Sequence, residues 1–112
     1  MSSTQQVILT TSIIAAAALV QQRLVGADNA PCQAGAVALG VAEVDAVTGD
    51  ITPVNVLGII AVEAGAAVTK GLAVQSDADA CVVPQAEAGI SVGIALDEAL
   101  EAGDVIRILR GV

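Results

Sequence analysis

The sequence predicts a mainly β protein: one small β-barrel or β-tulip-like domain with at most short helices. Three observations support this prediction. Short apolar runs are separated by Gly, Asp and Asn, which is the pattern of strands joined by tight turns. A chain of 112 residues has the length of a single domain. Two stretches of the chain also resemble each other, as two similar β-rich halves would.

The internal similarity is clearest in two phrases. "GVAEVDAVTGDITPV" begins at Gly40, and "GIALDEALEAGDVIRI" begins at Gly93. Each places Gly-[Val/Ile]-Ala before acidic residues and then Gly-Asp-[Ile/Val]. Upstream of them lie "CQAGAVAL" from Cys32 and "CVVPQAEAGISV" from Cys81. A duplicated unit explains this order, and chance is the competing explanation because Gly, Ala and Val are so common in this chain.

The expected elements follow from hydrophobic periodicity. Alternation predicts strands over 7–13 and 51–65, and a closing strand over 105–112. Residues 12–25, "SIIAAAALVQQRLV", also fit a helical stripe with four consecutive alanines, but the repeat favours strand there. Residues 96–103, "LDEALEAG", could form a short helix that ends near Gly103.

Two Gly-Asp pairs are expected at turns. Gly49 and Gly103 supply backbone freedom where the chain reverses. Asp50 and Asp104 can accept hydrogen bonds from nearby backbone amides in those turns. We therefore interpret these carboxylates as turn residues and not as catalytic acids.

The charge and composition exclude several classes of protein. The formal net charge is −8, no residue is aromatic, and there is no histidine. Nucleic-acid binding needs clustered basic residues and often aromatic stacking platforms, so we expect no nucleic-acid partner. More than half of the residues are apolar, which favours burial by self-association and predicts a homo-oligomer. The basic residues are Arg23, Lys70, Arg107 and Arg110.

The most apolar stretch, residues 7–20, does not read as a membrane segment. It has fourteen residues, which is too few to cross a bilayer as a helix, and Thr and Ser interrupt it. The preceding "MSSTQQ" has no positive side chain, as a signal peptide would require. We expect no membrane partner and synthesis in the cytoplasm.

No enzyme, cofactor site or metal site is expected. Lys70 in "EAGAAVTKGLAV" has the glycine spacing of a biotinyl or lipoyl turn, but it lacks the flanking methionines of biotin carriers. Asp77 and Asp79 are not followed by the glycine and glutamate of an EF-hand loop. Cys32 and Cys81 cannot hold zinc alone, and we expect them to be buried thiols.

Several phrases, taken in order, resemble those of one known family. They are "RLVGAD", "ALGVAEVDAVTGDITPVNVLGIIAVEAGAAVTKGLAVQSDADACVV" and "VGIALDEALEAGDVIRILRGV". The chain is similar to small capsid cement, or head-decoration, proteins of tailed bacteriophages, over roughly residues 7–112. The resemblance implies a compact, non-catalytic β domain.

It also implies a virion protein on the outer capsid surface. Such a protein binds the major capsid protein, often as a homotrimer, and clamps neighbouring capsid subunits of the expanded head. In this interpretation residues 1–6 are a flexible polar arm and residues 7–112 are the decoration domain. We expect the arm to add a strand to a capsid sheet edge, through the capsid-contact candidates Ser2, Ser3, Thr4, Gln5, Gln6 and Val7.

Two alternatives remain open at this stage. The first is a non-catalytic carrier or β-clip binding module, for which Lys70 would be the attachment point. The second is another minor virion component, such as the base of a fibre or spike.

Overall fold

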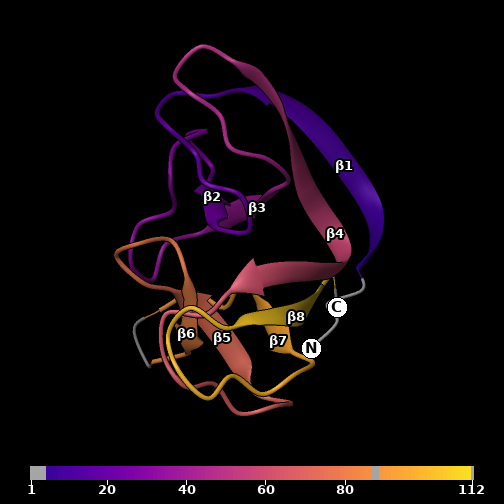
Figure 1. Ribbon diagram of the computed structural model, residues 1–112, viewed down its shortest axis with the longest axis vertical. Coiled ribbons are helices and arrows are strands. Elements are labelled where there is room, and N and C mark those ends of the chain that lie inside the picture. The colour runs from indigo at the N-terminus through magenta and orange to yellow at the C-terminus, as the bar shows by residue number, and fades with distance from the viewer. Residues whose placement is uncertain (1–4, 87–88, 112) are drawn as a thin grey trace.

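The computed structural model describes residues 5–86 and 89–111, and it forms one barrel-like antiparallel sheet (Figure 1). The described residues contain strands and no helix, which confirms the predicted fold class. The strands are β1 (Gln6–Ile14), β2 (Leu24–Gly26), β3 (Ala38–Ala42), β4 (Ile51–Glu63), β5 (Ala73–Ser76), β6 (Val82–Pro84), β7 (Gly93–Ala95) and β8 (Val105–Arg110).

The sheet has the order β2-β3-β4-β8-β7-β5-β6, and β1 pairs with β4 beside this path. β4 is the longest strand and the centre of the sheet. Its first part pairs with β1 and β3, and its last part pairs with β8. In Figure 1 β4 bends between these two parts, so that β1 and β8 extend in different directions. The exchange of partners occurs near Gly58, which has a φ of 113°.

The internal repeat is present in the backbone hydrogen bonds. We call residues 6–57 the first repeat and residues 58–110 the second repeat. In the first, Leu19 and Ala46 exchange two backbone bonds of 2.9 and 3.0 Å. In the second, Val68 and Ala99 exchange two bonds of the same lengths. The two halves therefore share one pattern of pairing, as the sequence similarity suggested.

The same correspondence extends to the core. A smaller cluster lies in the first repeat and a larger one is centred on the second. All six buried members of the smaller cluster have a counterpart in the larger one. The pairs are Ala15 and Ala64, Leu19 and Val68, Val25 and Val74, Ala42 and Ala95, Ala46 and Ala99, and Val54 and Ile108. Because no aromatic side chain is available, each half fills its interior with small aliphatic groups.

Two helical alternatives are corrected by the structure. The strand that the sequence favoured over 12–25 is present only at the two ends of this stretch, because β1 ends at Ile14, irregular chain follows, and β2 begins at Leu24. Residues 96–103 form no helix because other partners take their backbone groups. Ala99 bonds Val68, and the Asp104 carboxylate accepts from the Leu100 amide at 2.9 Å.

Candidate functional site: interaction surfaces

The last residues of the predicted arm, Gln5 and Gln6, are attached to β4 of the domain. Gln6 and Val7 lie in β1, opposite Ile59 and Gly58 of β4. The Gln5 side-chain oxygen accepts a hydrogen bond of 3.0 Å from the Ala61 amide. Val7 also packs against the larger core cluster. The candidates Ser2, Ser3 and Thr4 lie outside the described residues.

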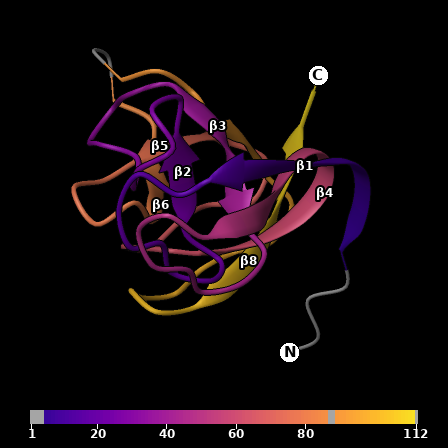
Figure 2. The same cartoon turned by 90° about the horizontal axis from the view of Figure 1, so that it is seen from above.

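β1 presents an uncharged strand surface with exposed isoleucines. It pairs only with β4 among the described strands, and Figure 2 shows it on the outside of the sheet. Ile8 is 83% exposed and Ile14 is 62% exposed, and Ile51, opposite Ile14, is 78% exposed. The sequence analysis found the strand but not this exposure. The clue was available, because Ile8 and Ile14 fall on the face opposite Val7 and Ile13.

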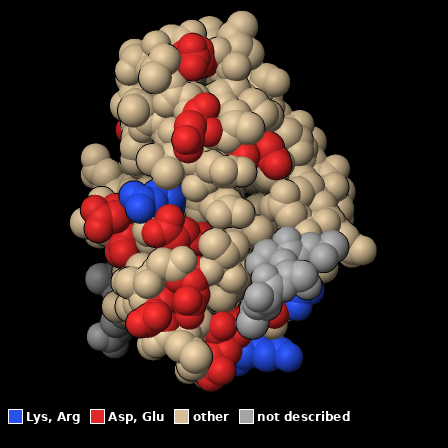
Figure 3. All heavy atoms as spheres, in the orientation of Figure 1, with Lys and Arg blue, Asp and Glu red and all other residues tan. Residues whose placement is uncertain are grey.

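Charge is distributed unevenly over the molecule. In Figure 3 the acidic side chains are densest in the lower left part and a few lie in the upper middle, whereas the upper right edge, where β1 lies in Figure 1, shows no charged side chain. No residue of β1 is ionisable. An open, uncharged strand edge of this kind is a template for pairing with another chain.

Asp50 and Asp104, the acids of the two Gly-Asp pairs, accept hydrogen bonds from nearby backbone amides. The Asp50 carboxylate accepts from the Val47 amide at 3.0 Å, in the same way as Asp104 accepts from Leu100. Both preceding glycines have positive φ, 92° at Gly49 and 96° at Gly103. These bonds confirm the interpretation of the two Gly-Asp pairs as turn chemistry.

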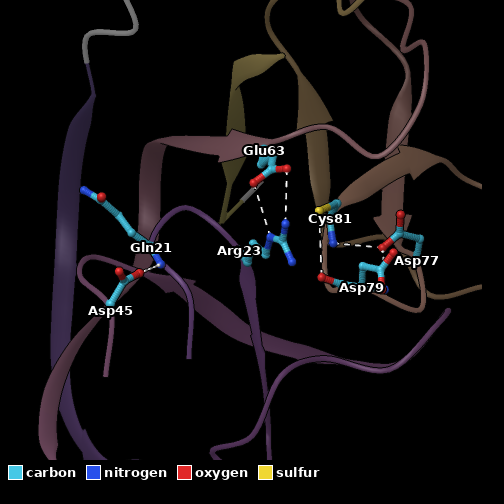
Figure 4. A network of polar contacts seen from close by, with 7 residues as sticks. All are labelled: Gln21, Arg23, Asp45, Glu63, Asp77, Asp79 and Cys81. Carbon is cyan, nitrogen blue, oxygen red and sulfur yellow. Dashed lines mark hydrogen bonds and ion pairs between the residues drawn. The ribbon is translucent and has the colours of Figure 1, made fainter. Parts of the chain in front are cut away.

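The Asp77 carboxylate closes its own turn. It accepts from the amides of Asp79 at 2.8 Å and Cys81 at 2.9 Å (Figure 4). In residues 5–86 and 89–111, no group of three or more His, Cys, Asp or Glu side chains is placed to hold a metal ion. Over the same residues, no helix is long and apolar enough to cross a membrane.

The two cysteines are buried and free. Burial is the main cause that raises the pKa of both thiols, and it raises that of Cys81 to about 11. Thiols with such pKa values are poor nucleophiles at neutral pH. Lys70 lies exposed in the turn before β5, next to a surface hollow lined by Asp97, Glu98 and Asp104.

One contact joins the two repeats at the surface, and Figure 4 shows it from close by. Arg23, just before β2, meets Glu63 at the end of β4, with 3.2 Å between Nε and Oε1 and 3.4 Å between Nη2 and Oε2. The hydrogen bond that Arg23 donates to the Glu63 carboxylate is the main cause that raises the pKa of Arg23. The Glu63 amide also donates to the Gln22 carbonyl at 2.7 Å. Nothing in the sequence indicated this pairing.

A second ion pair predicts how stability changes with pH. Arg107 donates to Asp97 from Nε at 2.9 Å and from Nη2 at 2.8 Å. The Arg107 side-chain bonds are the main cause that lowers the pKa of Asp97 below its ordinary value of 3.8. The contribution to stability is therefore complete above the unfolded pKa and is lost as pH falls through the lower folded pKa.

We expect the free energy of unfolding to fall when the solution is acidified from about pH 5 to about pH 2. Asp97→Asn should reduce the slope of that fall, because its side chain no longer titrates. Denaturant unfolding at several pH values measures both slopes. Equal slopes for the two proteins would contradict an acid-sensitive role for Asp97.

Comparison with known proteins defines the family. The model of a family described as phage cement protein matches residues 2–110. This chain belongs to the phage cement protein family. Membership confirms the resemblance seen in the sequence and makes the chain a structural protein of a phage virion.

One solved structure resembles the cement fold described here. It is the head fiber gp8.5 N base in bacteriophage phi29, with a TM-score of 0.75 and 22% sequence identity. The match covers 92% of this chain and 93% of the phi29 chain. At this identity the likeness shows a shared fold. No curated protein matches the chain.

Proposed function

We propose that this protein binds the outer surface of a tailed-phage head and stabilises the expanded shell by clamping neighbouring major capsid subunits. The observation that supports this best is the cement family match over nearly the whole chain. The protein acts as a homotrimer in this proposal, is made in the host cytoplasm, and has no catalytic activity, cofactor or nucleic-acid partner. The acidic surface fits a position outside the shell, because packaged DNA would repel it.

Purified heads that lack the protein provide the direct test. Adding the protein back should protect these heads from heat or osmotic shock, and it should saturate at a fixed ratio to the major capsid protein. An unchanged loss of packaged DNA at full occupancy would refute the clamping role. Failure to bind at all would refute the capsid partner.

The likeness to a fibre base favours a second candidate, a minor component that supports another virion part. Copy number separates the two proposals. Quantitative mass spectrometry of virions should find this chain at a near-equimolar ratio to the major capsid protein if it is a cement protein. A few copies per virion would favour the fibre or vertex role. The intact mass from the same sample would reveal any covalent addition at Lys70.

Truncation tests the arm, and the structure decides where to cut. Removing residues 1–4 leaves the Gln5 and Gln6 contacts with β4 in place. We expect this variant to keep its unfolding temperature and to bind heads at least about tenfold more weakly, as the loss of an added strand would cause. Equal binding by the truncated and full-length proteins would remove the arm from the mechanism.

Removing residues 1–6 is the matched comparison. This cut also takes away the Gln5 bond to the Ala61 amide and the pairing of Gln6 with Ile59. It should cost about 1–2 kcal/mol of unfolding free energy, as expected for a small number of lost hydrogen bonds. If only the longer truncation lowers the free energy of unfolding, weaker head binding by the shorter truncation cannot be caused by a loss of folding.

A further inference from the structure

Each repeat has two equivalent surfaces: a turn before a short strand, and the end of a long strand. In the described residues, the turn of the first repeat contacts the strand end of the second repeat, but the turn of the second repeat does not contact the strand end of the first. The turn that precedes β2 in the first repeat contacts the end of β4 in the second repeat, through Gln22, Arg23 and Glu63. The counterpart surfaces are the turn that precedes β5 and the end of β1. We call these the β5 turn (Lys70, Gly71 and Leu72) and the β1 end (Ile14).

Hydrogen bonds identify the β5 turn as the counterpart of the turn before β2. In the first repeat the Gln22 amide donates to the Ala42 carbonyl, and the Ala42 amide donates to the Arg23 backbone carbonyl. In the second repeat the Gly71 amide donates to the Ala95 carbonyl, and the Ala95 amide donates to the Leu72 carbonyl. Gln22 and Gly71 also share positive φ values of 66° and 91°. Leu72 therefore occupies the position of Arg23.

Strand register identifies the β1 end in the same way. Ile14 is the last residue of β1 and lies opposite Ile51, the first residue of β4. Glu63 is the last residue of β4 and lies opposite Val105, the first residue of β8. Ile14 therefore occupies the position of Glu63, and the Arg23–Glu63 ion pair has Leu72 and Ile14 as its counterpart.

These counterpart residues are both apolar, and among residues 5–86 and 89–111 no backbone hydrogen bond joins the β5 turn to the β1 end. Leu72 is 56% exposed and Ile14 is 62% exposed, whereas Arg23 and Glu63 are half-buried against each other. Leu72 and Ile14 are apolar, whereas Arg23 and Glu63 at the equivalent positions of the internal contact are charged. Exposed apolar groups next to an open strand edge mark an interaction surface.

We propose that a second copy of this chain occupies this surface, with the β5 turn of one copy against the β1 end of the next. Leu72 then packs on Ile14, and the Gly71 carbonyl accepts from the Ile14 amide as Gln22 accepts from Glu63. The contact is head to tail, so every copy uses both surfaces. The contact between copies can match the internal contact only approximately. Within the chain β4 connects the two repeats without a break, whereas between copies β8 of one chain and β1 of the next are not covalently joined.

This inference specifies the self-association in the proposed function, and purified protein without heads tests it. Sedimentation equilibrium should find multiples of the 11.0 kDa chain. Ile14→Glu and Leu72→Arg should each weaken association at least about tenfold, because each places one unpaired charge in an apolar contact. Both sites are exposed, so the variants should keep their unfolding temperatures. Ile8→Glu, at a residue 83% exposed near the other end of β1 and outside both surfaces, is the control and should associate normally.

Two further experiments distinguish a head-to-tail contact from any other. The double variant Ile14→Glu/Leu72→Arg recreates the Arg23–Glu63 pair between copies and should recover association. A mixture of the two single variants should also associate more strongly than either variant alone, because neighbouring copies of the two kinds meet through the apolar pair at one contact and through the recreated ion pair at the other.

Several outcomes would overturn the proposal. One is a wild-type protein that stays monomeric. This result would contradict the contact between copies, but it would not contradict binding to the capsid, which the experiment with purified heads tests separately. Another is association that survives both single substitutions. Dissociation by Ile14→Glu alone would instead indicate a symmetric contact between two β1 edges, and this result also contradicts the head-to-tail contact.

Discussion

Gly58→Ala is expected to destabilise the protein by about 3–5 kcal/mol. Gly58 has a φ of 113°, a conformation that residues with a β-carbon rarely adopt. An added β-carbon would also lie 2.5 Å from the Gln6 carbonyl oxygen and 2.8 Å from the Ile8 amide nitrogen. The substitution therefore strains β4 at its bend and pushes β1 away. Denaturant unfolding measures the loss.

Two other glycines separate the causes of this effect. Gly49 has a φ of 92°, but nothing lies within 4 Å of an added β-carbon, so Gly49→Ala isolates the strain and should cost about 1 kcal/mol. Gly40→Ala isolates the collision, because its β-carbon would meet the Asn55 carbonyl across β3 and β4. If Gly58→Ala cost no more than Gly49→Ala, the tight approach of β1 to β4 would be disproved.

Arg110→Met should cost about 3 kcal/mol, which is a large effect for one residue at the end of the chain. Backbone carbonyls hold the guanidinium group, and among the carboxylates of the described residues none pairs with it. Its bonds go to the carbonyl oxygens of Val56 at 2.8 Å, Val92 at 2.7 Å, Ala38 at 3.0 Å and Leu39 at 3.3 Å. Burial lowers the pKa of this arginine. Methionine keeps the apolar stem and leaves these oxygens without their donor.

Arg23→Met is the matched control for Arg110→Met. Arg23 makes an ion pair near the surface, and such pairs contribute about 0–1 kcal/mol. Thermal and denaturant unfolding of the two variants should therefore differ clearly. Similar losses at both positions would show that the carbonyl contacts of Arg110 contribute no more than an exposed ion pair.

Local sequence signals located the turns well and the long-range contacts poorly. Gly49-Asp50 and Gly103-Asp104 were predicted because a turn needs a permissive backbone and a nearby acceptor, and both requirements are met within a few residues. Arg110 gave no such signal. Its partners come from β3, β4 and the segment before β7, which approach it only after the sheet has closed.

The candidate site shows the same division. The sequence placed an interaction segment at the start of the chain, and the structure describes Gln5–Val7 as bonded or paired to β4, while residues 1–4 lie outside the described part. Alternation along β1 could place Ile14 on the outward face, but it could not show that Ile14 and Leu72 remain uncovered, because exposure depends on which neighbouring segment covers a residue. Their counterparts Glu63 and Arg23 are covered by each other.

By itself, the sequence determined the β class and the positions of the reversing turns, and it suggested two related halves. Alternation, turn residues and repeated phrases are local properties, and they are readable along the chain. Only the tertiary structure decided that β4 serves both halves, that β1 remains at an edge, and that one pair of equivalent surfaces is joined while the other is open. The reason is physical: strand pairing and packing between distant segments select among arrangements that local propensity leaves equally possible.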